Sequence, residues 1–213
     1  MTTTLIQSAN RFLLKNISWQ TYEALLKDME SQPGIRLTYD RGILEIMSPL
    51  DPHETYSKLI GRFVETLTEE LNIEIRSLGS RTCKREDLAR GLEPDEYYYI
   101  HNESVVCHLE QIDLNQDPPP DLAIEIADTT LPNDIGNKRL LYEEVGVSEY
   151  WVVDVKKTQI RAFEVANNGS RLIQESVVLP GLLISLLEEA LQRSREMDQS
   201  QVGAWLLQQF QAM

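Results

Sequence analysis

The stretch that decides the fold is PDLAIEIADTTLPNDIGNKRLLYEEVGVSEYWVVD, residues 120–154. Residues 121–128 form a β-branched run of strand length, residues 132–145 have a helical pattern, and residues 148–155 are a second strand-like run. Gly146 is a natural stop for the helix between them, and an Asn or Asp near its start can cap it. Strands that alternate with helices in this way predict an α/β fold.

Further elements are expected on both sides of this stretch. A regular apolar stripe predicts a helix over residues 51–71, and Asp40-Arg41-Gly42 between two alternating runs predicts a hairpin. The other expected elements are a helix at 18–29, strands at 72–86 and 94–102 that form a three-stranded meander with 121–128, a hairpin from strands at 158–165 and 170–179, and a helical C-terminus from 180. We therefore expect one domain over residues 1–213, a mixed β-sheet flanked by helices, with helical extensions at both termini.

The composition is that of a globular protein, with 42% hydrophobic and 25% charged residues among 213. Lys and Arg number 20 against 34 Asp and Glu, which gives a net charge of −14. This balance argues against a general polyphosphate-binding surface, so any contact with nucleic acid must be local. Two cysteines without C-x-x-C spacing, and no run of about 18 apolar residues, predict a reduced, cytoplasmic protein that is not embedded in a membrane.

Candidate chemistry begins with Glu125 and Lys138. Glu125 shares one face of its strand with two alanines, which leave room beside the carboxylate for a hydrated ion or a substrate. On a helical wheel Lys138 lies on the inward stripe, where an ammonium is costly unless a carboxylate faces it. Two plainer alternatives stay open: Glu125 is solvated on an exposed sheet face, or Lys138 snorkels and pairs with Asp134 one turn earlier.

Two further acids and a histidine are candidates for the same site. If the strand that Asp95 opens runs antiparallel to the strand of Glu125, Asp95 lies near Glu125, whereas Asp121 is about 13 Å away along its own strand. Oxygen ligands of this kind suit Mg²⁺ or Mn²⁺ better than zinc. His53 lies near the centre of the apolar stripe of its helix and is expected to point inward, either as a site residue or as a core histidine. Glu54 is a rival for that place because helix phase is least certain at a helix end.

Four segments resemble the Uma-type restriction endonuclease family, within the PD-(D/E)XK nuclease superfamily: GILEIMSPLDPHE (42–54), EPDEYYYI (93–100), the stretch 120–154 and LPGLLISL (179–186). The likeness covers nearly the whole chain. It implies a restriction-endonuclease-like core and metal-dependent cleavage of DNA phosphodiesters. It also implies that Asp95 belongs to the PD element, that Glu125 is the acid of the third motif, and that His53 is the histidine of the first helix.

One position departs from the superfamily pattern, which has lysine two residues after the acid, where this chain has Ala127. In the Uma-type pattern a lysine on the following helix substitutes, and Lys138 in DIGNK matches it, in agreement with the helical wheel. The resemblance implies that Asp95, Glu125 and the carbonyl of Ile126 hold Mg²⁺ or Mn²⁺, with water as the nucleophile. Lys138 would orient that water or balance charge in the transition state, and it should lie within salt-bridge reach of Glu125.

In this scheme His53 either donates a hydrogen bond to a group that holds the metal, or contacts the phosphate. Three functions stay open: a DNA endonuclease, a catalytically inactive nuclease-fold module for DNA binding or assembly, and another metal-dependent hydrolase. The acidic net charge favours the inactive module, whereas one segment could supply a local phosphate patch and contains a rival lysine, Lys84. The basic residues of that segment are Arg76, Arg81, Lys84, Arg85 and Arg90.

The C-terminal segment carries an apolar face in a region that is otherwise rich in glutamine. Its apolar residues include Trp205, Leu206 and Phe210. Such a face predicts a homodimer, or it folds back onto the core of its own chain.

Overall fold

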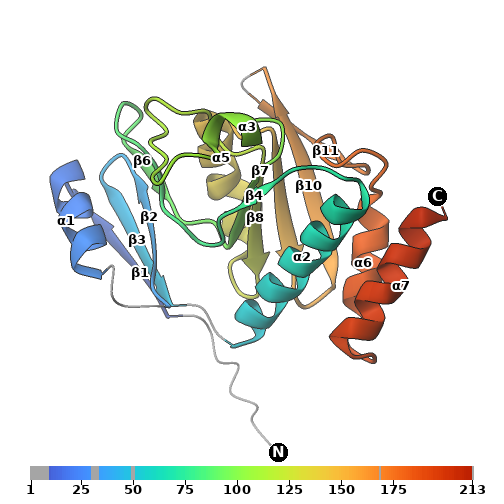
Figure 1. Cartoon of the computed structure of the whole chain (residues 1–213). Helices are drawn as coiled ribbons and strands as arrows, with labels where there is room; N and C mark the ends of the chain where they lie inside the picture. Colours follow the sequence, from blue (N-terminus) through green and yellow to red (C-terminus); the bar gives the residue numbers. More distant parts are fainter. Residues whose placement is uncertain (1–9, 30–33, 49–50, 168, 213) are drawn as a thin grey trace, which may run out of the picture.

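The computed structural model describes residues 10–29, 34–48, 51–167 and 169–212, and its strands form two sheets (Figure 1). The larger sheet has the strand order β11-β10-β9-β8-β7-β4. Its central strands β8 and β9 run parallel, and the other neighbours run antiparallel. The strands are β4 (Arg76–Ser77), β7 (Glu96–Tyr99), β8 (Leu122–Ala127), β9 (Glu149–Asp154), β10 (Gln159–Ala166) and β11 (Gly169–Ile173).

Helices cover both faces of the larger sheet. Because side chains alternate along a strand, β8 sends Leu122, Ile124 and Ile126 to one face and Glu125 with its two flanking alanines to the other. The first face packs against α2 (Asp51–Glu70), α6 (Ile184–Arg193) and α7 (Gln199–Gln211), which lie together in Figure 1. The second face packs against α5 (Arg139–Val145) and the short α3 (Glu103–Val106).

The smaller sheet lies beside the larger one and carries α1 (Trp19–Met29) (Figure 1). Its order is β1-β3-β2-β6-β5, with β1 (Asn10–Lys15), β2 (Arg36–Asp40), β3 (Ile43–Ser48), β5 (Cys83–Arg85) and β6 (Arg90–Leu92). Tyr22 of α1 stacks on Tyr39 of β2 with ring centroids 4.9 Å apart. A Cβ at Gly91 would lie 2.0 Å from the Tyr22 hydroxyl oxygen, so this close approach of helix and strand requires glycine.

The α/β class, a mixed sheet flanked by helices, is confirmed, and so is the predicted antiparallel pairing of the strands around residues 95–100 and 121–127. The hairpin of β2 and β3 and that of β10 and β11 also form, although β11 ends at Ile173. The single strand expected at 72–86 is wrong. β4 joins the larger sheet and β5 the smaller one, and Gly79, with φ of 57°, lies in the turn between them.

The helix expected at 132–145 forms, but in three parts. They are α4 (Leu131–Asn133), the π-helix η1 (Asp134–Lys138) and α5. At the N-terminus the expected helical extension is preceded by an unpredicted strand, β1. β1 is therefore an edge strand of the smaller sheet.

The apolar face of α7 is used within the chain. α7 packs against α2 and α6, Leu206 is fully buried, and Trp205 and Phe210 pack against the same core. The face folds back on its own core, so it no longer supports the homodimer, which stays a prediction. In the described part of the chain, no helix is both long and apolar enough to cross a membrane.

Candidate active site

A buried cluster of acids and cations lies where α2, the strands β7 and β8, and η1 meet. The register of β7 and β8 pairs Glu96 with Ile124, which brings Asp95, just before β7, next to Glu125. η1 supplies Asp134 and Lys138, and α2 supplies His53. The five side chains that form this cluster belong to residues at most 5% exposed: His53, Asp95, Glu125, Asp134 and Lys138.

Glu125 is held by two donors from the helical segment that follows its strand. The Lys138 Nζ donates to Oε2 at 2.8 Å, and the Tyr142 hydroxyl donates to Oε1 at 2.6 Å. The prediction that Lys138 is buried within salt-bridge reach of Glu125 is confirmed, and a solvated Glu125 is excluded. Sequence reasoning missed Tyr142 as a partner, although its place four residues after Lys138 puts both on one helix face.

Lys138 faces a second carboxylate as well. Its Nζ lies 3.7 Å from Asp134 Oδ1, so the pairing considered as the plainer alternative exists beside the one with Glu125. Both residues belong to η1 and are buried, and the Tyr150 hydroxyl donates at 3.0 Å to the Asp134 carbonyl. A π-turn within a helix is often found at functional sites.

Asp95 is fixed by its own sheet and by α2. The backbone amide of Ile126 donates to Asp95 Oδ2 at 2.7 Å, and His53 Nε2 lies 3.0 Å from the same oxygen. His53 thus points inward, as the helical wheel predicts. Glu54 lies at the rim with 48% of its side chain exposed, and its Oε1 is 3.9 Å from His53 Nδ1.

Three carboxylates of the cluster share two cationic groups. Burial raises the pKa of Glu125 to about 8, and the charges of Asp95 and Asp134 add to this rise against the opposing effect of Lys138. Burial opposes the charged form of Lys138, but the surrounding carboxylates raise its pKa above the ordinary value. Burial likewise opposes a charged His53, and the contact with Asp95 raises the pKa of His53. The cluster therefore has more acids than cations.

This donor set fits a divalent metal ion. Mg²⁺ keeps several waters and commonly takes one or two protein carboxylates, so Asp95 and Glu125 are sufficient. The Asp134 Oδ1 is buried and accepts no hydrogen bond from the described residues, although the Lys138 ammonium lies 3.7 Å away. Among the residues that the structure describes, no group of three or more His, Cys, Asp and Glu side chains is arranged as a ready metal site.

Asp121 has a different environment. Its carboxylate accepts the backbone amides of Ile100 at 2.7 Å and Asn102 at 3.1 Å, and also the Asn102 side-chain amide at 3.1 Å. It therefore fixes the loop after β7, and its contacts lie outside the acid cluster.

The expected basic patch does not form as one surface. Arg90 is fully buried, and its guanidinium pairs with both Asp40 and Glu144. Arg76 donates to the carbonyls of residues 106 and 109, and Arg85 pairs with Asp87.

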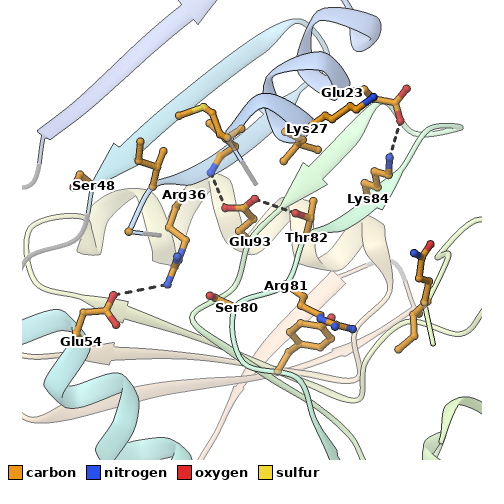
Figure 2. Close-up of a pocket in the computed structure, with 18 of the residues that line it drawn as sticks. Glu23, Lys27, Arg36, Ser48, Glu54, Ser80, Arg81, Thr82, Lys84 and Glu93 are labelled. Atoms are coloured by element: carbon orange, nitrogen blue, oxygen red, sulfur yellow. Dashed lines mark hydrogen bonds and ion pairs between the residues drawn. The ribbon is translucent and has the colours of Figure 1, made fainter. Parts of the chain in front are cut away.

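Of these five basic residues, only Arg81 and Lys84 line a groove of about 1170 Å³. The groove lies between α1, β2 and the segment 80–84 (Figure 2). There Lys84 pairs with Glu23 at 2.6 Å, and none of its described contacts is to the acid cluster.

Comparison with known proteins places the chain in a family. A family model, Uma2, described as "Putative restriction endonuclease", matches residues 19–200. The chain belongs to the Uma2 family. The match includes every residue of the acid cluster. Among curated proteins none matches the chain significantly.

A solved structure shares the fold of this Uma2 protein. It is the crystal structure of a putative nuclease belonging to DUF820 from Anabaena variabilis, with a TM-score of 0.50 and 13% identity. The likeness covers 80% of this chain and 90% of that chain. At this identity the comparison supports the fold alone.

Proposed function

We propose that this Uma2 protein is an endonuclease that hydrolyses DNA phosphodiester bonds with bound Mg²⁺ or Mn²⁺. The observation that carries the proposal is the buried pair of carboxylates, Asp95 and Glu125, on adjacent strands with the Lys138 ammonium 2.8 Å from Glu125. Two carboxylates and a lysine in one cluster are the groups that metal-assisted phosphoryl transfer requires. Membership of a restriction endonuclease family supports DNA as the substrate.

Asp95, Glu125 and the carbonyl of Ile126 would hold the ion. When bound, a divalent ion polarises a phosphate oxygen and makes a coordinated water more acidic. Lys138 keeps its proton, because its pKa is raised, and therefore acts as a fixed positive charge beside the reacting phosphate. His53 orients Asp95 from α2 and can present its second ring nitrogen, Nδ1, toward the rim of the site.

The experiment is cleavage of supercoiled plasmid by the purified chain with Mg²⁺, Mn²⁺ or EDTA, together with metal binding by calorimetry. We expect cleavage only with a divalent ion, and we expect Asp95→Asn and Glu125→Gln to lose both metal binding and cleavage. Lys138→Ala should bind metal and fail to cleave. Glu189→Gln, on the exposed side of α6, is the matched control and should behave as the wild type.

Three results would contradict the proposal. Metal-independent cleavage, or DNA binding without any cleavage, would favour an inactive module or contamination by another nuclease. If Lys138→Ala were active and Lys84→Ala inactive, the role of the catalytic lysine would belong to Lys84 of β5.

A further inference from the structure

The groove beside the acid cluster contains a cation with unused hydrogen-bonding capacity. Arg36 of β2 lines the groove, and its side chain points toward Glu54 (Figure 2). Its Nη2 lies 3.8 Å from Glu54 Oε1, and its Nε lies 3.9 Å from Asp95 Oδ1. Both separations are too long for hydrogen bonds. The buried Nε finds no hydrogen-bond partner among the described residues.

This position connects the groove to the proposed catalytic centre. Among the described cations that line the groove, Arg36 is the one that lies within 4 Å of a carboxylate of the acid cluster, that of Asp95. The groove's volume of about 1170 Å³ exceeds the roughly 300–1,000 Å³ of a small-ligand pocket, which favours an extended ligand. A guanidinium with free donors is the side chain best suited to bind a phosphate through two hydrogen bonds.

Glu54 is the group that a phosphate would replace. Its side chain is 48% exposed at the end of the groove, so it can turn into solvent without losing a buried contact. While it faces Arg36, its negative charge competes with any phosphate for the guanidinium. Removing that charge should therefore strengthen phosphate binding, and removing Arg36 should weaken it.

We propose that Arg36, which lines the groove and lies 3.9 Å from Asp95, binds a backbone phosphate of the DNA strand, and that Glu54 competes with this phosphate. The inference rests on the proposed function, because it takes DNA as the ligand. It adds a substrate-binding residue that lies outside the acid cluster.

The test is binding of a fluorescent DNA duplex by anisotropy over a range of salt, in EDTA and again with Ca²⁺. Arg36→Ala should lose about 10-fold to 100-fold in affinity, and the slope of log K against log salt should fall by about one. Glu54→Gln should gain severalfold in affinity, and this gain should vanish in the Arg36→Ala background. Arg171→Ala on β11 and Glu189→Gln on α6 change charge equally at other exposed places and should stay within about 2-fold of the wild type.

Circular dichroism verifies that each variant is folded. The inference is overturned if Arg36→Ala binds like Arg171→Ala, if Glu54→Gln gains nothing, or if the wild type binds no DNA in either condition. Its failure is distinguishable from failure of the proposed function. Metal-dependent cleavage with normal binding by Arg36→Ala would overturn only the inference, whereas Arg36-dependent binding without cleavage would overturn only the nuclease.

Discussion

Replacing Lys138 by methionine should destabilise the fold because it leaves buried acids without their counterion. At 2.8 Å the attraction between Lys138 and Glu125 is about 6 kcal/mol for an effective dielectric of about 20, and Asp134 at 3.7 Å adds to it. Desolvation of the ammonium offsets part of this attraction. Removing one partner of a buried pair typically costs about 3–5 kcal/mol, which is the loss we expect at pH 8 without metal.

The loss should depend on pH in a defined direction. Glu125 binds its proton more tightly in the folded chain than in the unfolded one, because its pKa is raised to about 8. The folded state therefore loses stability as pH rises from the ordinary glutamate value toward about 8. Without the Lys138 ammonium this pKa rises further, so Lys138→Met should cost more at pH 8 than at pH 5.

The assay is urea unfolding followed by circular dichroism in EDTA at both pH values. The double variant Glu125→Gln/Lys138→Met removes both charges and should recover at least half of the stability that the single variant loses. Lys157→Met, in the exposed turn after β9, is the control and should stay within about 0.5 kcal/mol. A loss below about 1 kcal/mol at pH 8, or a double variant no more stable than the single one, would refute the view that Lys138 neutralises the buried acids.

Three further predictions follow from the contacts described. Asp121→Asn should lower the free energy of unfolding by about 1–3 kcal/mol, because it weakens the bonds to residues 100 and 102, while metal affinity measured by calorimetry should stay unchanged. His53→Gln should cost most stability below pH 6.5 and progressively less as pH rises through the raised pKa of His53, and urea unfolding at pH 5.5 and pH 9 would show no difference if this pairing were absent. Leu206→Ala should cost about 2–5 kcal/mol in thermal or urea unfolding, and a cost near zero would contradict the packing of α7.

Much of the fold and the centre of the site can be predicted from the sequence, because the elements that form them have clear local patterns. The strand at 121–127 and the helix at 51–70 are long enough for their periodicity to be unambiguous, and one register then brings Asp95 to Glu125. Three strands that were missed or misassigned are short, whereas the unpredicted β1 has six residues. β4, β5 and β6 have two or three residues each and depend on partners distant in sequence, so local pattern cannot assign them to a sheet.

Arg36 escaped prediction because tertiary packing sets its surroundings, whereas Tyr142 shares a helix face with Lys138 and could have been found from the sequence. Arg36 is one polar residue in an alternating strand, and its place beside Asp95 arises only when the smaller sheet packs next to the larger one. Charge alone was also misleading in the segment 76–90, where the buried Arg90 is neutralised by ion pairs with Asp40 and Glu144. A sequence shows which residues can carry charge, but not which charges are already neutralised by the fold.

The packing around β8 explains why the ammonium beside Glu125 comes from η1. Ala127, two residues after Glu125, is buried on the same face of β8 as Glu125. That face is covered by side chains of η1 and α5, among them Tyr142, which already donates to Glu125. A lysine at 127 would have to fit into this packed layer, whereas one on η1 reaches the carboxylate from the helix that covers it. The small residue on the strand and the lysine on the helix are therefore two parts of one arrangement, which places the ammonium beside Glu125.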